Sequence, residues 1–319
     1  MTITRQSRNI GAVVGAAIGD AMGHPTEFVS SFEGLVERYG PKGVTRFEKY
    51  WEREGKRFAP YTDDTQMAEV VLRTLLEGHE ELDETMTRMA QGFVDWAKNP
   101  QGGHRAPGMA CMGGCRRLES GIHWSEAGGE TAGGCGSVMR VYPFGLIFSD
   151  DIAKAEYWAT EHSKLTHRDP IAMAACAAMT VAMVHIVDEK ETSFILSEMV
   201  EACARYSGNT ADLVEQAIRE ATLGIEPRVT LERLEGWAAH EAIAAAAYIF
   251  ARHSDDFVGA VLEGANTPGD SDSLATLAGA LTGARCGIEA IPEEWIKDVE
   301  RSDELMGLGI RIGAEHQGV

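Results

Sequence analysis

Two short segments combine carboxylates with hydroxyl groups, and each stands directly before an apolar stretch with helical periodicity. The segments are TDDTQ at residues 62–66 and PGDSDS at residues 268–273. Partial positive charge at a helix N-terminus lowers the cost of keeping nearby carboxylates ionised. Taken singly, each segment is better explained as a helix cap, because Thr, Ser and Asp accept hydrogen bonds from the first turn of a helix.

The two segments together support a different interpretation, because they supply more carboxylates than capping requires. If the two helix starts face each other, they offer hard oxygen atoms and neither sulfur nor imidazole. That donor set suits Mg²⁺, Mn²⁺ or Ca²⁺ rather than zinc, and it is large enough for two ions that share a bridging carboxylate. Without cations, four crowded carboxylates would repel one another strongly. The candidate metal ligands are Thr62, Asp63, Asp64, Asp270, Asp272 and Ser273.

Near the N-terminus, glycines recur every fourth residue at Gly11, Gly15 and Gly19. This spacing places a stripe of glycines on one face of a helix, where a neighbouring backbone can approach closely. Gly23 and the proline two residues later end the pattern. Glu27 then falls in a loop, where the spacing leaves open whether it is a surface carboxylate or one directed at a site.

Two further segments could bind a ligand. The glycine-rich run GGCGSVMR at residues 133–140 could present backbone N–H groups to a phosphate or to sugar oxygens. It lacks the P-loop and Rossmann signatures, and a tight loop that needs positive φ explains it equally well. His167 lies just before an expected helix start, where it is either a hydrogen-bonded structural residue or a ligand.

These candidates must be positioned by helices, because helical periodicity covers most of the chain and alternating stretches are nearly absent. The window 101–136 is rich in glycine and is expected to form loops broken by one short helix. With no linker or internal repeat, we expect one compact all-α domain over residues 1–319. The predicted helices cover residues 64–76, 83–97, 151–163, 169–187, 192–206, 210–222, 237–252, 272–288 and 293–305.

Composition excludes several classes of protein. Among 319 residues, 29 Lys and Arg oppose 49 Asp and Glu, a net charge of −20, which disfavours general nucleic-acid binding. We expect no membrane span, because no apolar run reaches about 18 residues and the best candidate, 10–18, ends at Asp20. No signal peptide is expected either, so we predict a soluble cytoplasmic protein, and a monomer. The six cysteines form no Cys-x-x-Cys pair and are interpreted as free thiols.

With these residues assembled, the chain resembles the ADP-ribosylglycohydrolase family, which includes the dinitrogenase reductase-activating glycohydrolases and the ADP-ribosyl-acceptor hydrolases. Each motif is weak by itself, but the set occurs in the family's order from residue 11 to about residue 290. The matching motifs are GDAMG at 19–23 with Glu27, TDDT at 62–65, GSVMR at 136–140, Thr166-His167, and GDSDS at 269–273.

The resemblance implies an all-α orthogonal helical bundle around a dinuclear Mg²⁺ or Mn²⁺ centre, held by the six candidate ligands. It places Glu27 in a mobile loop beside the metals. Gly136, Ser137, Val138 and His167 would line the ADP-ribose pocket, with backbone amides binding the diphosphate. The implied activity is hydrolysis of the glycosidic bond between ADP-ribose and an acceptor, such as a protein arginine, with release of ADP-ribose. We assign Glu27 as general base or substrate gate.

Two alternatives remain at this stage. One is a non-catalytic relative, similar to the jellyfish lens crystallins or acting as an ADP-ribose-binding protein, but four clustered acids argue against it. The other, a helical phosphohydrolase, would be expected to carry His ligands beside its Asp pairs. Two departures from the family leave the acceptor open. Cys135 stands where relatives often have Asn, and RAPG at 105–108 occupies the loop where the dinitrogenase reductase-activating enzymes have a catalytic Asp.

Overall fold

The computed structural model describes residues 3–53 and 55–315. It confirms the all-α class, since the described strands form only one antiparallel hairpin, β1 (Trp51–Arg53) with β2 (Lys56–Phe58), which was not predicted. The helices are α1 (Arg5–Gly23), α2 (Phe32–Tyr39), α3 (Asp63–Glu77), α4 (Leu82–Lys98), α5 (Met109–Glu119), α6 (Trp124–Ala127), α7 (Tyr142–Ile147), α8 (Ile152–Ser163), α9 (Pro170–Val187), α10 (Thr192–Ala204), α11 (Gly208–Thr222), α12 (Pro227–Leu231), α13 (Ala239–His253), α14 (Phe257–Ala265), α15 (Ser271–Cys286), α16 (Glu293–Asp298) and α17 (Ser302–Glu315), with short 3₁₀ turns η1 (His24–Thr26), η2 (Cys135–Ser137) and η3 (Ile288–Ala290).

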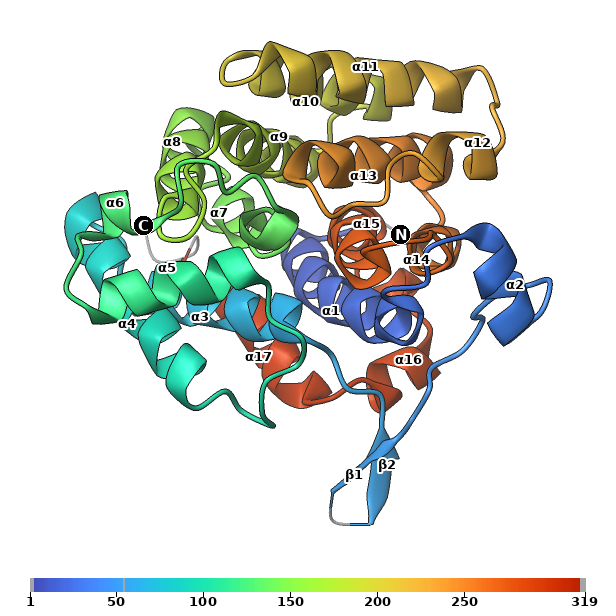
Figure 1. Cartoon of the computed structure of the whole chain (residues 1–319), viewed down its shortest axis with the longest axis horizontal. Helices are drawn as coiled ribbons and strands as arrows, with labels where there is room; N and C mark the ends of the chain where they lie inside the picture. The colour runs from blue at the N-terminus through green and yellow to red at the C-terminus, as the bar shows by residue number, and fades with distance from the viewer. Residues whose placement is uncertain (1–2, 54, 316–319) are drawn as a thin grey trace.

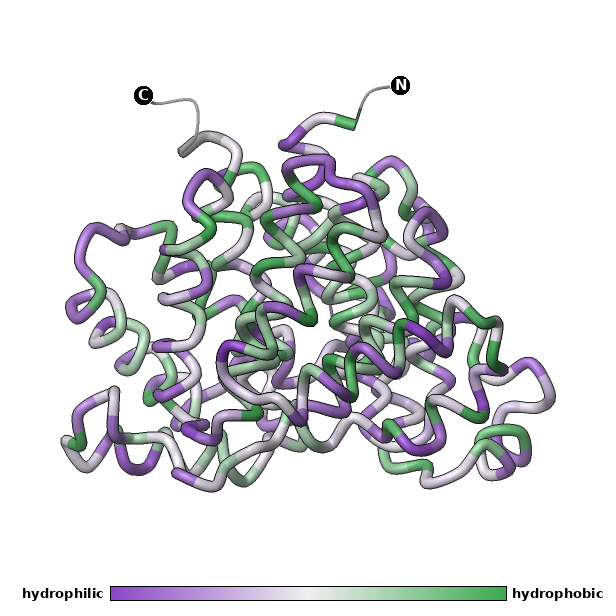
Figure 2. The backbone as a smooth tube through the Cα atoms, turned by 90° about the horizontal axis from the view of Figure 1, so that it is seen from above, coloured by the Kyte–Doolittle hydropathy of each residue, from purple (hydrophilic) through white to green (hydrophobic). Residues whose placement is uncertain are grey.

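Helices α1 and α15 form the centre of the bundle. Figure 1 shows α9 and α13 above them, with α10 and α11 outermost, while α3, α4 and α5 lie to the left, α16 and α17 lie below, and the hairpin projects at the bottom. Hydrophobic segments concentrate along the inner helices in Figure 2, and hydrophilic ones along the outer turns. The buried apolar side chains form one continuous cluster from Ala12 to Ile312. The single domain over 1–319 stays a prediction.

The predicted glycine stripe explains how closely α1 and α15 approach each other. A Cβ at Gly15 would lie 2.4 Å from the carbonyl oxygen of Gly279, and one at Gly19 would lie 1.9 Å from that of Ala275. The two helices run antiparallel, because Gly11 faces Gly283 at the opposite end. The C-terminal end of α1 therefore lies beside the N-terminal end of α15, where the second acidic segment begins.

Helix α9 corrects one expectation. Its 18 residues are long and apolar enough to cross a membrane, so the statement that no run reaches this length was wrong. In the structure, 78% of this stretch is buried inside the protein. It packs against α8, α10 and α13, and this arrangement is that of a core helix surrounded by others.

Two further predictions are wrong in detail. The helix predicted over 293–305 is two helices, because the backbone between them pairs with Ala59 instead of continuing the helix. The Glu300 N–H donates to the Ala59 carbonyl, and the Ala59 N–H donates to the Asp298 carbonyl. The window 101–136 contains α5 and α6 rather than one short helix. Gly114 in α5 serves close packing, since a Cβ there would lie 2.6 Å from the carbonyl of Leu165.

Candidate active site

The two acidic segments meet at the starts of α3 and α15. Ser273 Oγ donates a hydrogen bond to Asp64 Oδ2 at 2.9 Å, and Thr62 Oγ1 donates to Asp272 Oδ2 at 3.4 Å. Thr62 also caps α3 by accepting from the Asp64 N–H. The first acidic segment therefore both caps its own helix and contacts the second acidic segment. The arrangement required for a shared cation site is thus present, although each segment also begins its own helix.

A cavity of about 320 Å³ opens over this junction. Eight of the predicted site residues line it, whereas Thr62, Ser137 and Val138 do not. The lining residues are Glu27, Asp63, Asp64, Ala106, Gly108, Met109, Ala110, Cys111, Gly134, Cys135, Gly136, Met139, His167, Trp237, Asp270, Asp272 and Ser273.

The cavity carries five carboxylates, and none of the described residues that line it is a lysine or an arginine. Burial, and then the proximity of Asp272, raises the pKa of Asp63 to about 8 and that of Glu27 to about 10. The same two causes raise the pKa values of Asp64 and Asp270 well above their usual range. Several buried carboxylates that, among the described residues, pair with no lysine or arginine fit divalent cations, which would be held by the six candidate ligands.

These shifts predict how pH acts on the cation-free protein. A carboxylate whose pKa is raised in the folded state binds more protons there than in the unfolded chain, so folding stability falls as pH rises between the two values. For Asp63 that window runs from 3.8 to about 8. Each excess proton costs about 1.4 kcal/mol per pH unit. Divalent cations should offset this loss.

We therefore expect the Tm of chelated protein to fall from pH 5 to pH 8 relative to that of protein saturated with Mg²⁺. Differential scanning calorimetry of both forms across this range measures the difference, and groups remote from the site cancel in the subtraction. A Tm difference that does not change with pH would contradict the prediction.

Asp20, in the motif GDAMG, contacts the first acidic segment but was not among the predicted site residues. It lies on α1 and is fully buried; its Oδ1 accepts from the Thr62 N–H at 2.8 Å, and its Oδ2 accepts from Thr65 N–H and Oγ1 at 3.0 and 2.6 Å. Burial and the nearby Asp272 raise its pKa to about 6. Asp20 thus ties α1 to the start of α3. An acid inside an apolar glycine-rich helix was the available signal.

Glu27 is directed at the site, which decides the alternative that spacing left open. Only 7% of its side chain is exposed, and its Oε2 lies 3.5 Å from His24 Nδ1. Two main-chain bonds fix its loop against the second acidic segment: Phe28 N–H donates to Gly269 at 3.1 Å, and Gly269 N–H donates to Val29 at 2.9 Å. The structure therefore brings Glu27 onto the start of α15.

The glycine-rich turn forms η2 rather than a direct helix start. Gly136 lines the cavity, and its N–H lies in the first turn of η2, where the turn itself supplies no acceptor for it. Ser137 instead turns into the core, where its Oγ accepts from Ser163 Oγ at 2.9 Å, and Val138 is fully buried. Any contact of these two residues with a ligand would have to use the backbone, and this stays a prediction.

His167 lines the cavity as a neutral imidazole. Burial, and then the charge of Arg140, lowers its pKa to about 3. Arg140 Nη2 donates to Thr166 Oγ1 at 2.7 Å, and that hydroxyl lies 2.7 Å from His167 Nδ1. The buried guanidinium thus fixes the ring, which can hydrogen-bond to a ligand without carrying charge.

The two departures from the family motif, Cys135 and the segment RAPG at 105–108, lie differently with respect to the cavity. Cys135 enters the acid cluster, because its Sγ donates to Asp270 Oδ2 at 2.8 Å and lies 3.1 Å from Ser273 Oγ. Arg105 does not line the cavity and forms a bidentate ion pair with Glu300, in which Nη1 donates to Oε2 at 2.6 Å and Nη2 donates to Oε1 at 3.1 Å. All six cysteines are free thiols, as predicted.

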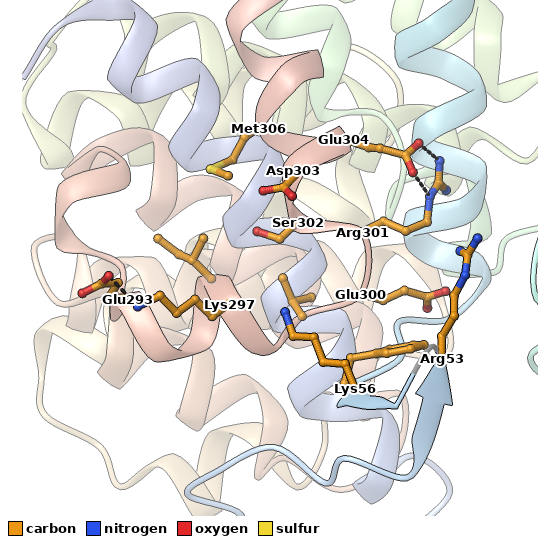
Figure 3. A pocket seen from close by; sticks show the side chains of 13 residues that line it. Arg53, Lys56, Glu293, Lys297, Glu300, Arg301, Ser302, Asp303, Glu304 and Met306 are labelled. Carbon is orange, nitrogen blue, oxygen red and sulfur yellow. Dashed lines mark hydrogen bonds and ion pairs between the residues drawn. The ribbon is translucent and has the colours of Figure 1, made fainter.

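A larger cavity of about 890 Å³ lies between the hairpin and helices α16 and α17 (Figure 3). Its lining contains four basic and four acidic side chains. Figure 3 shows Arg301 facing Glu304 and Lys297 beside Glu293, pairs that the structure joins at 3.0 and 2.6 Å. Because its charges compensate one another, we place the candidate site at the smaller cavity.

The helical bundle carries a buried acid cluster, and a glycine-rich turn adjoins the same cavity. The family model of ADP-ribosylglycohydrolase matches residues 1–318, and the chain belongs to this family.

Several relatives extend over nearly the whole chain. The ADP-ribosyl-[dinitrogen reductase] glycohydrolase of Rhodospirillum rubrum is 25% identical over 299 residues, which cover 93% of this chain and 92% of the relative. The ADP-ribosylhydrolase ARH3 of Homo sapiens is 25% identical, with 93% and 90% covered. The ADP-ribosylarginine hydrolase Tri1 of Pseudomonas putida is 27% identical, with 93% and 76% covered. A solved ADP-ribosylglycohydrolase-related protein complex shares the fold, with a TM-score of 0.70, 23% identity and 97% of each chain covered.

Proposed function

We propose that this protein hydrolyses the glycosidic bond between ADP-ribose and an acceptor, and releases ADP-ribose, with two Mg²⁺ or Mn²⁺ ions held by the acid cluster. The observation that carries the proposal is the meeting of the two acidic segments around a cavity whose described lining includes neither lysine nor arginine. The names of the relatives support the same bond type. A crystallin-like or merely ADP-ribose-binding role is disfavoured, because unpaired buried carboxylates are costly unless they hold cations.

The proposed chemistry divides between the cations and the chain. The cations would hold the hydroxyls of the distal ribose and lower the pKa of water. Glu27 would accept the proton of the attacking water on its carboxylate, or gate the substrate. Carboxylates beside the ribose stabilise the oxocarbenium-like transition state of glycosidic cleavage. The Gly136 N–H and the neutral His167 ring would bind the diphosphate by hydrogen bonds, because none of the described residues that line the cavity is a lysine or an arginine.

Release of free ADP-ribose tests the proposed function. The substrates are arginine-, serine- and nucleic-acid-linked ADP-ribose, each with Mg²⁺, with Mn²⁺ and with chelator. We expect release from at least one substrate, loss of release with chelator, and recovery when either metal is added back. Hydrolysis that chelator leaves unchanged would refute the metal assignment, and ADP-ribose binding without any release would favour the non-catalytic alternative.

The role of Glu27 has its own test. Glu27→Gln keeps the size of the side chain but removes its ability to accept a proton, and loss of a general base typically costs about 10²- to 10⁴-fold in rate. We expect kcat to fall within this range while ADP-ribose still binds, as measured by calorimetry. A Glu27→Gln variant that binds ADP-ribose and keeps full turnover would contradict the role of Glu27 as general base or substrate gate.

Cytoplasmic location and a monomeric state are proposals from composition only. Analytical ultracentrifugation of the purified full chain would measure the oligomeric state.

A further inference from the structure

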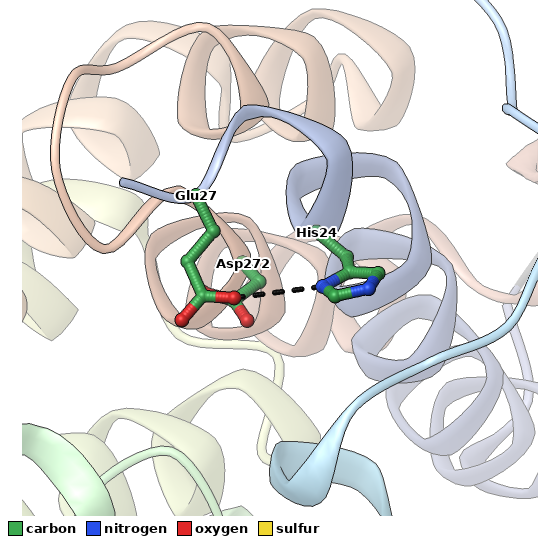
Figure 4. Close-up of side chains that lie close together, drawn as sticks. All are labelled: His24, Glu27 and Asp272. Carbon is green, nitrogen blue, oxygen red and sulfur yellow. Dashed lines mark ion pairs between the residues drawn. The ribbon is translucent and has the colours of Figure 1, made fainter. Parts of the chain in front are cut away.

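His24 brings an imidazole to the edge of the acid cluster, and it belongs to neither acidic segment. It opens η1 directly after α1 and faces Glu27 and Asp272 (Figure 4). One donor atom from each of these three side chains lies within 4.8 Å of the other two. Donors that share one ion at about 2.0–2.2 Å stand at most about 4.4 Å apart. A slight closure would therefore place all three on one cation.

Two of the three side chains, those of His24 and Glu27, also have unused bonding capacity. Within the described residues, neither His24 Nδ1 nor Glu27 Oε2 has a hydrogen-bond partner, and both atoms are buried. Their separation of 3.5 Å is an ion-pair distance rather than a hydrogen bond. A buried polar atom without a partner costs folding free energy, so its persistence indicates a ligand that satisfies it. The Glu27 side chain is more than nine-tenths buried and points at Asp272.

The turn that carries His24 is held rigidly enough to present a donor. Thr26 Oγ1 donates to the carbonyl of Ala265 at 2.6 Å and contacts Ser271 Oγ at 3.0 Å. Tyr39 Oη donates to the carbonyl of Pro25 from outside the turn. These contacts tie η1 to the start of α15, which carries Asp272. A ligand set held by such surrounding contacts is preorganised for binding.

We propose that His24 Nδ1 is a metal ligand, which completes with Glu27 and Asp272 a mixed nitrogen and oxygen site at one edge of the acid cluster. Imidazole suits first-row transition ions such as Mn²⁺, Co²⁺ or Zn²⁺ better than Mg²⁺, which takes oxygen donors. The protein should accordingly bind Mn²⁺ in preference to Mg²⁺ at this position. The inference rests on the proposed function for the neighbouring cation site and adds a ligand from outside the two acidic segments.

Electron spin-echo spectroscopy of the full chain loaded with Mn²⁺ tests the proposal, because a directly bound imidazole nitrogen modulates the echo. We expect this modulation in the unmodified protein, its loss in His24→Ala, and its retention in His167→Ala, which removes the other imidazole at the cavity. Calorimetry should show that His24→Ala weakens Mn²⁺ binding about tenfold and Mg²⁺ binding much less. Circular dichroism checks that the variants fold.

Three outcomes would overturn the inference. Mn²⁺ binding without nitrogen modulation would show that His24 only pairs with Glu27, and would leave the proposed hydrolase function intact. Modulation that survives in His24→Ala but disappears in His167→Ala would assign the nitrogen to the other ring. If neither Mn²⁺ nor Mg²⁺ binds and no ADP-ribose is released, the proposed function fails together with the inference.

Discussion

Asp272→Asn is expected to reduce hydrolysis by at least about a thousandfold, equivalent to about 4 kcal/mol of activation free energy. Asp272 lies at the centre of the cluster: it contacts Thr62 at 3.4 Å, and it contributes to the raised pKa values of Asp63, Asp64 and Asp270. Asparagine keeps the shape of the side chain and an oxygen for the Ser273 N–H, which Asp272 Oδ1 accepts at 3.0 Å. The substitution therefore removes a negative charge but preserves the helix start.

The control for this prediction is a carboxylate that only caps a helix. Asp151 accepts from the Lys154 N–H at 3.0 Å at the exposed start of α8 and does not line the cavity. Asp151→Asn should leave ADP-ribose release and Mn²⁺ binding unchanged, whereas Asp272→Asn should weaken both. If Asp272→Asn kept its activity to within tenfold, the prediction would be contradicted, and the acidic segments would serve only as helix caps.

The local parts of the site could be predicted from sequence because they obey local rules. A hydroxyl followed by carboxylates before an apolar stretch predicts a helix start whatever surrounds it, and both starts lie within one residue of the expected position. The glycine stripe predicted a close helix contact, and α15 provides it. The family motifs then supplied the order in which these pieces combine.

The remaining parts depend on contacts between distant segments. Asp20 acts through Thr62 and Thr65, residues that no periodicity connects to α1. The break between α16 and α17 arises because the backbone at Asp298 and Glu300 pairs with Ala59. The helical pattern over 293–305 cannot predict this pairing, because Ala59 lies far away in the sequence. Likewise, the glycine-rich turn was located correctly, but its local sequence does not indicate that Ser137 faces the core.

The contact between α1 and α15 leads to the second large prediction, which concerns stability. Gly19→Ala would place a Cβ 1.9 Å from the carbonyl oxygen of Ala275, a main-chain atom that cannot rotate away. Overpacking of this kind costs about 1–3 kcal/mol, and a rigid backbone neighbour favours the upper end. The helix propensity gained from alanine, about 1 kcal/mol, does not offset that cost.

The same substitution should also disturb the site, because Asp20 follows Gly19 directly and holds the start of α3. We expect Gly19→Ala to lower the Tm by about 3 °C and to weaken Mn²⁺ binding. Gly307→Ala in α17 is the matched control, since a Cβ there meets nothing within 4 Å, and it should raise the Tm slightly. If both variants had the same Tm as the parent, α1 and α15 would be able to separate freely. In that case, close backbone contact would not be what holds the two acidic segments in register.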